Sequence, residues 1–463
     1  QRVLTQLISF CVSVVLARML APEDFGVVAL SGMLIILIGS FIDTGIGTAL
    51  IQKKDADELD YNTVFYTNIV LSSTVYVIIF LIAPLLAALF KSPEITSVIR
   101  VMSLGMPIGA LSGVHSSMIS KNLAFKKFFF STLSGSLLSA VVGLSMVLQG
   151  CGVWALVGQN LVSTIANTIV LLLIVRWRPK RMFSKERFKS LFSYGWKLTA
   201  SNLMGTFFAQ MKGYAIGLRY TTADLAYYNR GEGVPGILYN NISSSINTVL
   251  FPALSKLQDD KIAIRRALSK TMQTASFVLM PGLLGLAAVS DNFVQIVYTS
   301  KWIAVVPFMQ VICLMNCFDL LGAANIQALK AVGRADTLLK LEVYKKPLMV
   351  SILVICMFIS PLAIAIGQFF YSLIALVINA YPNRKYIDYP LKKQFLDISK
   401  SFYSAVLMAF IVYFIGKLSF NIYLLLIFQI LVGVAVYVLL SMKFNKVVFQ
   451  EVLALVKHRV LKK

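Results

Sequence analysis

The stretch Val27-Val-Ala-Leu-Ser-Gly-Met-Leu-Ile-Ile-Leu-Ile-Gly-Ser-Phe-Ile42 contains no charged side chain, and it opens a predicted helix over residues 27–50. Apolar runs of this kind follow one another along the chain, separated by short connectors. A helix that crosses the hydrocarbon core of a bilayer needs about 20 mostly apolar residues. With 58% hydrophobic residues, 14% charged residues and a mean hydropathy of +0.79, the chain is too apolar for a soluble domain. The sequence therefore predicts an all-α, polytopic integral membrane protein.

Run lengths, caps and helix breakers predict about fourteen transmembrane helices. Their predicted limits are residues 3–20, 27–50, 62–90, 95–120, 128–149, 152–176, 194–218, 224–252, 266–290, 304–331, 338–358, 360–382, 399–418 and 420–442. Three pairs of consecutive predicted helices are separated only by short breaks, at Gly150–Gly152, at Pro361 and at Lys417. The chain begins at Gln1 instead of Met, so we expect native residues before it.

The basic residues indicate the orientation of these helices. With a cytoplasmic N-terminus, the cytoplasmic connectors and the tail hold most of the 43 Lys and Arg residues. Because cytoplasmic loops are enriched in Lys and Arg, we expect both termini in the cytoplasm. The net charge of +23 sits at helix ends and forms no continuous basic face. It therefore favours contacts with anionic phospholipids, and we expect no nucleic-acid partner.

An internal repeat predicts two similar halves. Leu20-Ala-Pro-Glu-Asp24-Phe-Gly26 and Tyr220-Thr-Thr-Ala-Asp224-Leu-Ala226 each end the first helix of a half and begin the second. Two six-helix halves related by an axis along the membrane normal place a polar cleft between them. We expect an N-terminal lobe (1–176), a cytoplasmic linker (177–193), a C-terminal lobe (194–382), a cytoplasmic connector (383–398), two additional helices (399–442) and a basic cytoplasmic tail (443–463).

Four basic residues near the predicted interface of the halves are candidates for a shared anion-binding role: Arg18, Lys212, Arg219 and Arg230. A charged side chain at the centre of a membrane helix costs about 2.5–3.5 kcal/mol on insertion scales, so each one kept there needs an explanation. Lys212 lies too deep to reach the cytoplasmic surface easily. The alternative interpretation makes Arg18 and Arg219 interfacial anchors and pairs Arg230 with a nearby acid, Glu232 or Asp224.

Two acids and two polar residues complete the candidate site. Asp43 and Asp319 are candidates for coupling to Na⁺ or H⁺, although Asp43 also suits a structural role at a helix break before Gly45-Ile-Gly47. Tyr228 and Asn229 offer an aromatic face and an amide that suit a sugar. The five Cys residues lack the paired spacing of a metal site, and we expect no metal and no cofactor.

Several segments together resemble one family, the Wzx-type polysaccharide flippases of the multidrug/oligosaccharidyl-lipid/polysaccharide exporter superfamily. The similarity is greatest to the subgroup of the colanic acid exporters. It rests on Leu16-Ala-Arg-Met-Leu-Ala-Pro-Glu-Asp-Phe-Gly26, Phe41-Ile-Asp-Thr-Gly-Ile-Gly47, Ala226-Tyr-Tyr-Asn-Arg230, Phe251-Pro-Ala-Leu-Ser-Lys-Leu-Gln-Asp-Asp260, Lys301-Trp302 with Val306-Pro307, and Leu329-Lys-Ala-Val-Gly-Arg334.

The resemblance implies a transporter of the bacterial inner membrane that flips an undecaprenyl-diphosphate-linked oligosaccharide, a polysaccharide or lipopolysaccharide repeat unit, to the outer leaflet. The resemblance also implies glycosyltransferases and a polysaccharide polymerase as partners. It implies that Na⁺, H⁺ or the membrane potential drives transport. Family members often carry an acid just before the basic residue of the seventh helix, where this chain has Met211-Lys212. The alternative is a drug or cation antiporter of the same superfamily. A membrane glycosyltransferase or polymerase is disfavoured, because the outer connectors are too short to build a catalytic site.

Overall fold

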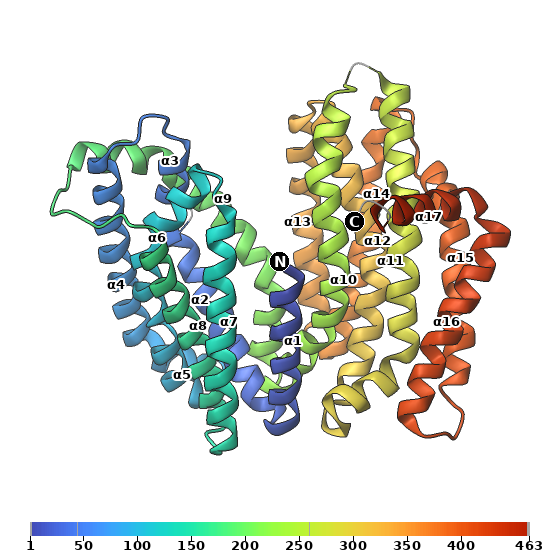
Figure 1. Cartoon of the computed structure of the whole chain (residues 1–463), viewed down its shortest axis with the longest axis horizontal. Helices are drawn as coiled ribbons and strands as arrows, with labels where there is room; N and C mark the ends of the chain where they lie inside the picture. The colour runs from blue at the N-terminus through green and yellow to red at the C-terminus, as the bar shows by residue number, and fades with distance from the viewer. Residues whose placement is uncertain (1, 44, 259, 461–463) are drawn as a thin grey trace. The chain divides into compact units, whose positions relative to one another are not determined.

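The computed structural model describes residues 2–43, 45–258 and 260–460, without the side chains of residues 2–4, 43, 194, 335, 455, 456 and 458–460. Over these residues the chain forms seventeen α-helices and one short 3-10 helix, with no β-strand (Figure 1). The expected all-α class is therefore confirmed. The chain divides into two compact units, Gln1–Ala226 and Tyr227–Lys463.

The first unit contains α1 (Arg2–Met19), α2 (Pro22–Asp43), α3 (Ile46–Gln52), α4 (Glu58–Leu89), α5 (Glu94–Met102), α6 (Gly105–Lys121), α7 (Phe125–Leu148), α8 (Val153–Ile174), α9 (Lys185–Arg219) and the start of α10 (Thr222–Ser255). The rest of α10 belongs to the second unit, with α11 (Lys261–Tyr298), the 3-10 helix η1 (Ser300–Trp302), α12 (Val305–Ala331), α13 (Ala335–Cys356), α14 (Pro361–Tyr386), α15 (Leu391–Ile415), α16 (Ile422–Phe444) and α17 (Lys446–Val460). Each predicted transmembrane segment is helical.

Two of the predicted helices are each a pair of shorter ones. The segment over 27–50 is divided into α2 and α3, and the segment over 95–120 into α5 and α6. A close approach of two glycines explains the first division. A Cβ added to Gly195 of α9 would lie 2.6 Å from the carbonyl carbon of Gly45, so no side chain fits where the two backbones cross. The predicted divisions at Gly150–Gly152, Pro361 and Lys417 are confirmed, and Gly150 and Gly152 have φ angles of +76° and +54°.

Ten helical segments among the described residues are long and apolar enough to cross a membrane. A shorter apolar segment, Thr5–Met19, forms most of α1, and α9, α10 and α13 are more polar. The chain is thus a multi-pass membrane protein, while the number of fourteen spanning helices stays a prediction. The predicted lobe limits also stay a prediction, and in the structure α9 packs with the first unit, against α2 and α3.

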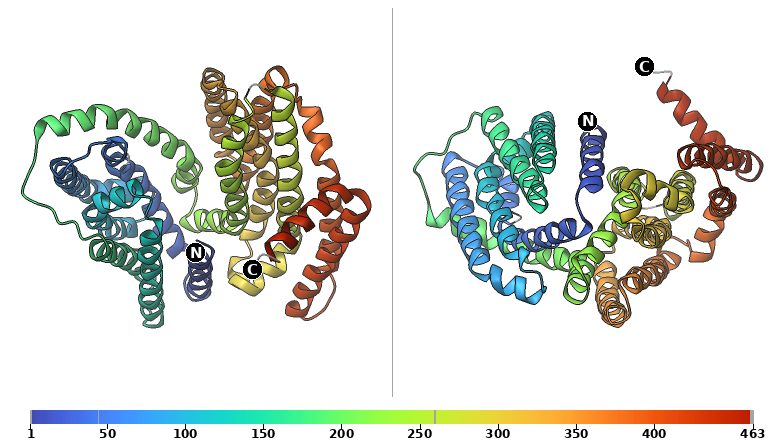
Figure 2. Two further views of the ribbon diagram at one scale, coloured as in Figure 1. Left: turned by 45° about the horizontal axis from the view of Figure 1, so that its top comes forward. Right: turned by 90° about the horizontal axis from the view of Figure 1, so that it is seen from below.

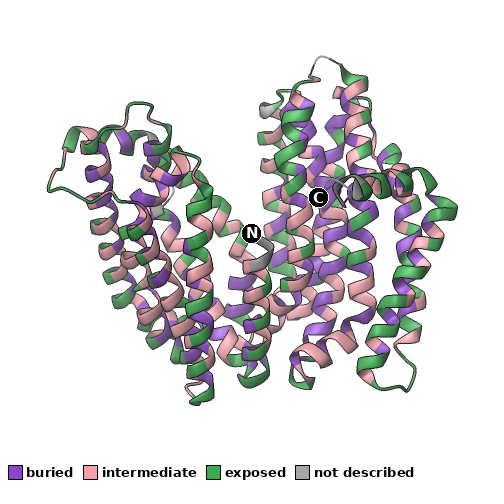
Figure 3. Ribbon diagram, viewed as in Figure 1, coloured by how far each residue is buried: buried purple, intermediate pink, exposed green. Residues whose placement is uncertain are grey.

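Exposure follows the pattern of a protein surrounded by lipid (Figure 3). Leu81 and Leu85 of α4 are 70% and 69% exposed, and many other large apolar side chains cover the outer faces of the helices. Amide side chains are buried instead, among them Asn68 of α4 and Gln429 of α16. A soluble protein shows the reverse arrangement, so burial independently supports the membrane assignment.

The first unit is held by helix packing and by its connectors. The hairpin of α7 and α8 packs on α1, and α4 packs on α5 and α6. The connector between α8 and α9 passes around the outside of α4, and α9 then curves over the unit (Figure 2). His115 of α6 is fully buried and its Nε2 lies 3.2 Å from the carbonyl oxygen of Trp177, which attaches this connector to the helices.

The second unit is built around α11 and α12. Helix α11 packs on α12, α15 and α16, while α14 packs on α12 and α13. A buried amide cluster joins three of these helices: Asn325 of α12 exchanges hydrogen bonds with Gln394 of α15 and accepts one from Asn383 of α14. Helix α17 crosses the direction of the other helices (Figure 1) and packs on α16 and α11.

Candidate functional site

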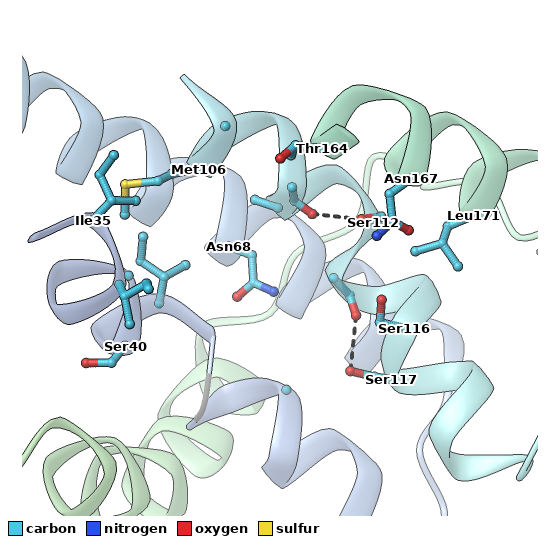
Figure 4. A pocket seen from close by; sticks show the side chains of 18 of the residues that line it. Ile35, Ser40, Asn68, Met106, Ser112, Ser116, Ser117, Thr164, Asn167 and Leu171 are labelled. Carbon is cyan, nitrogen blue, oxygen red and sulfur yellow. Dashed lines mark hydrogen bonds between the residues drawn. The ribbon is translucent and has the colours of Figure 1, made fainter. Parts of the chain in front are cut away.

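The first unit contains a cavity of about 840 Å³ that the sequence did not predict (Figure 4). Among its described lining residues none carries a charge. The lining combines apolar side chains with hydroxyl and amide groups, which are Ser40, Thr48, Asn68, Ser112, Ser116, Ser117, Ser120, Asn160, Thr164, Asn167 and Thr206. A volume of this size is typical of a pocket for an organic ligand.

Glycines create the space for this cavity. Gly105, Gly109 and Gly113 follow one another at four-residue intervals along α6, so they lie on one face of the helix. On α2, Gly32 also lines the cavity, and a Cβ added there would meet no atom within 4 Å beyond its own helix among the described residues. Without side chains at these positions the facing helices leave room between them.

Asn68 of α4 is the most informative lining residue (Figure 4). Its side chain is buried, with 6% exposed, and within the described part of the chain its Oδ1 has no hydrogen-bond partner. Its Nδ2 lies 3.2 Å from the position of a Cβ on Gly113, so the amide sits beside the glycine face of α6. A buried polar group without a partner costs about 1–3 kcal/mol. Asn68 is therefore a buried amide of the cavity wall whose Oδ1 is left unsatisfied among the described residues.

Three of the four predicted basic residues belong to the first unit. Arg18 and Arg219 are exposed and lie in the last turns of α1 and α9, where a positive charge interacts favourably with the helix dipole. Both roles of these residues, interfacial anchor and anion ligand, stay predictions. Lys212 is half-buried in α9. Arg230 belongs to the second unit, so a cavity shared by all four residues stays a prediction.

Arg230 is held by two aromatic residues that the sequence interpretation did not select. Its guanidinium carbon lies 5.6 Å from the ring centroids of both Tyr298 and Trp302, within the range of cation–π interactions. Trp302 is fully buried and Tyr298 is 2% exposed, so both rings are enclosed by the protein. Asp224, one proposed partner of Arg230, accepts hydrogen bonds from the backbone and hydroxyl of Thr221 and thereby caps α10.

The remaining predicted residues lie at separate places. Tyr228 is 1% exposed and packs edge-on against Phe308 of α12 at 6.0 Å, and Asn229 is half-buried. Asp319 of α12 accepts a hydrogen bond from Ser372 of α14, which ties these helices together. Asp43 ends α2, and its side chain lies outside the described residues. The sugar contact and the ion coupling assigned to these residues stay predictions.

Comparison with known proteins shows what this architecture is related to. A family model described as polysaccharide biosynthesis protein matches residues 15–307, which is more than half of the chain. The chain is 26% identical over 347 residues to the lipopolysaccharide biosynthesis protein WzxC of Escherichia coli K12, covering 74% of this chain and 70% of that protein. It is 25% identical to the succinoglycan biosynthesis transport protein ExoT of Rhizobium meliloti, with 70% and 66% covered. The teichuronic acid biosynthesis protein TuaB of Bacillus subtilis is 27% identical, with 64% and 62% covered.

Solved structures share the fold at low sequence identity. The lipid II flippase MurJ, in an inward closed conformation, is similar with a TM-score of 0.76 and 16% identity over 96% of this chain and 98% of that one. An inward-facing multidrug resistance transporter of the MATE family in the MOP superfamily has a TM-score of 0.63 and 14% identity, with 83% and 94% covered. The chain therefore belongs to the polysaccharide biosynthesis protein family, as its resemblance to the Wzx-type polysaccharide flippases predicted.

Proposed function

We propose that this protein is an alternating-access flippase for an undecaprenyl-diphosphate-linked oligosaccharide. In this proposal it lies in the bacterial inner membrane with both termini in the cytoplasm, and it carries the glycan from the inner to the outer leaflet. It performs no chemical reaction on its substrate. The enzymes next to it in such a process are glycosyltransferases that assemble the lipid-linked glycan and a polymerase that uses it.

The observation that carries the proposal is the uncharged polar cavity of the first unit. A sugar in transit must exchange its hydrogen bonds to water for hydrogen bonds to protein, because an unsatisfied hydroxyl is costly inside a membrane. Ser and Thr hydroxyls both donate and accept, and Asn offers two donors and an acceptor, so this lining can follow the hydroxyls of a sugar. Asn68 adds a buried amide to this lining.

The same lining disfavours the alternative function, export of cationic drugs. A cation entering a low-dielectric site needs a carboxylate or an aromatic face to offset its lost hydration. The described lining of the cavity contains no acid, and Phe128 is its aromatic residue. A neutral glycan fits this chemistry better than a cation does.

The charged end of the substrate needs different residues. Arg18, Lys212, Arg219 and Arg230 hold the diphosphate in our proposal, because Arg and Lys form charge-assisted hydrogen bonds with phosphate oxygens. The polyprenyl tail remains in lipid throughout. Moving one net charge across the membrane is worth about 2.3 kcal/mol per 100 mV, so an inside-negative potential assists outward movement of the anion. Coupling to Na⁺ or H⁺ through Asp43 or Asp319 is the further proposed source of energy.

Filling the cavity tests the proposal. Gly32→Leu places a side chain inside it, whereas Gly205→Leu changes an exposed glycine of α9 that does not line it. A Cβ added to either glycine would meet no atom of the described residues within 4 Å beyond its own helix. The two variants therefore start from a similar amount of free space next to the backbone. We expect lipid-linked oligosaccharide to accumulate in the inner leaflet of cells that carry Gly32→Leu in place of the native chain. Normal export by Gly32→Leu, at equal protein level, would contradict the proposed cavity.

A further inference from the structure

A second cavity, of about 370 Å³, lies in the second unit between the first turns of α11 and α15. Arg265, Arg266 and Ser269 line it from α11, and Lys393 and Asp397 line it from α15. In the orientation predicted from the basic residues, this end of both helices faces the cytoplasm. The cavity therefore lies where the headgroups of the inner leaflet meet the protein.

Some of the charged side chains in and beside this cavity form hydrogen bonds or ion pairs within the protein. Asp397 accepts hydrogen bonds from Ser269 at 2.5 Å and from the hydroxyl of Tyr389 at 2.6 Å. Burial raises the pKa of Tyr389, so its hydroxyl keeps the proton that it donates. The second carboxylate, Asp388, lies 2.7 Å from Arg265 and 3.5 Å from Lys393.

Arg266 is the basic residue of this cavity that forms an ion pair with neither carboxylate. Arg266 is exposed. Among the described residues, no carboxylate oxygen lies within 4.0 Å of its guanidinium nitrogens, which is the distance limit for an ion pair. Arg265, Arg266 and Lys393 line the cavity with one carboxylate, Asp397, while Asp388 lies beside them and Lys392 lines the adjoining cavity, so basic side chains outnumber acidic ones. This excess of basic side chains suits an anionic group such as a phosphodiester.

An apolar cavity of about 550 Å³ continues along α15 from this basic one. Phe395, Phe402 and Tyr403 line it together with Phe318 of α12, whose ring lies 5.9 Å from that of Phe402. Leu396 lines both cavities and is 61% exposed. Phe395 and Phe402 lie seven residues apart on one face of α15, with Ser399 between them, and Lys392 lines the same cavity one turn before Phe395.

We propose that the two cavities together bind one anionic phospholipid of the cytoplasmic leaflet. Its phosphodiester occupies the cavity of Arg265, Arg266 and Lys393, and one acyl chain lies along Phe395 and Phe402. Basic pockets between membrane helices on the cytoplasmic side are suited to anionic headgroups, and the guanidinium fork matches phosphate oxygens. The bound lipid bridges α11 and α15, independently of the transported substrate.

Native mass spectrometry of the purified full-length protein with added lipid tests this proposal. We expect retained phosphatidylglycerol on the native chain and about fivefold weaker binding by Arg266→Gln, because one basic residue near the membrane surface contributes about 1 kcal/mol. The matched control is Lys400→Gln, which removes an exposed cation of α15 that lines neither cavity and should bind as the native chain does. Phosphatidylcholine should bind more weakly to all three proteins.

Several outcomes would overturn the proposal. Equal binding of phosphatidylglycerol by Arg266→Gln and the native chain would exclude the basic cavity as the headgroup site. Competition by inorganic phosphate alone would assign the cavity to a free anion, and preferential displacement by undecaprenyl diphosphate would assign it to the lipid carrier. Unchanged retention by Phe402→Ser would exclude the apolar cavity. Gel filtration and thermal unfolding verify that each variant is folded, and binding is measured without transport, so a failure here leaves the proposed flippase function untouched.

Discussion

The backbone of Gly26 lies directly against the carbonyl group of Thr222. A Cβ added to Gly26 would lie 1.8 Å from the Thr222 oxygen, a distance that no side chain can occupy. Gly26 ends the first copy of the internal repeat, and Thr222 lies in the second copy. The two copies therefore meet, and they do so through backbone.

This contact predicts that Gly26→Ala destabilises the protein, because the added methyl forces the two backbones apart. Overpacking of this kind costs about 1–3 kcal/mol. Gly32→Ala is the control, since a Cβ there meets no atom beyond its own helix among the described residues. Thermal unfolding in detergent should show a lower midpoint for Gly26→Ala and little change for Gly32→Ala. Equal midpoints would contradict the close approach.

The buried amide cluster of the second unit predicts a large effect of Asn325→Leu. Asn325 Nδ2 donates to Gln394 Oε1 at 2.8 Å, and Gln394 Nε2 donates to Asn325 Oδ1 at 3.0 Å. Leucine leaves the Gln394 amide buried without these partners, at a cost of about 1–3 kcal/mol. Thermal unfolding provides the measurement. The exposed Asn202→Leu of α9 should unfold at the native temperature, and a similar result for Asn325→Leu would be evidence against the cluster.

Asp57 predicts a pH dependence of stability. The backbone amide of Asp60 donates to its carboxylate at 2.9 Å, and this bond lowers the pKa of Asp57 from its ordinary value of 3.8. Because the folded pKa is the lower one, the carboxylate stabilises the fold above pH 3.8, and this contribution disappears as the pH falls through the folded value. Asp57→Asn keeps the helix cap without the charge. Its unfolding midpoint should therefore fall less than that of the native chain below pH 3.8, and parallel pH profiles would refute this.

The diphosphate-binding role proposed for Arg230 and Lys212 predicts that replacing either residue reduces transport in a protein that still folds. Arg230→Ala removes the cation that lies over Tyr298 and Trp302, and Lys212→Ala removes the half-buried cation of α9. If both hold the substrate diphosphate, each variant should reduce flipping about tenfold or more, since a charge-assisted hydrogen bond contributes about 1.5–3 kcal/mol. Flipping of lipid-linked oligosaccharide in proteoliposomes is the measurement. Unchanged rates in both variants would remove these residues from the site.

The ion-coupling role proposed for Asp319 predicts that its replacement uncouples transport from an ion gradient. Asp319→Asn keeps a hydrogen-bond acceptor for Ser372 and removes the ionisable group. If Asp319 exchanges an ion during transport, the variant should flip its substrate at a rate that no longer responds to a Na⁺ or H⁺ gradient. A gradient response equal to that of the native chain would exclude Asp319 as the coupling residue.

The sequence alone predicted the class of this protein and most of its helical segments, but not α17 or the divisions between α2 and α3 and between α5 and α6. Long apolar runs are a local property that each helix satisfies by itself in lipid, and the breaks at Gly150–Gly152 and Pro361 depend on backbone chemistry at single positions. The repeat was visible for the same reason. Asp24 and Asp224 each accept a hydrogen bond from the backbone amide three residues earlier, at 3.1 Å, so the similar residues perform the same local task.

The tertiary structure decided which polar groups meet. The cavity around Asn68 is lined by residues between Gly32 and Thr206, and each of them is of a type that is common in membrane helices. For a similar reason the contact of Arg230 with Tyr298 and Trp302 was not predicted, because α11 and η1 bring those rings beside α10. Helix periodicity specifies the face that a residue occupies, but the neighbour across that face depends on how separate helices pack, and no local pattern in the sequence contains that information.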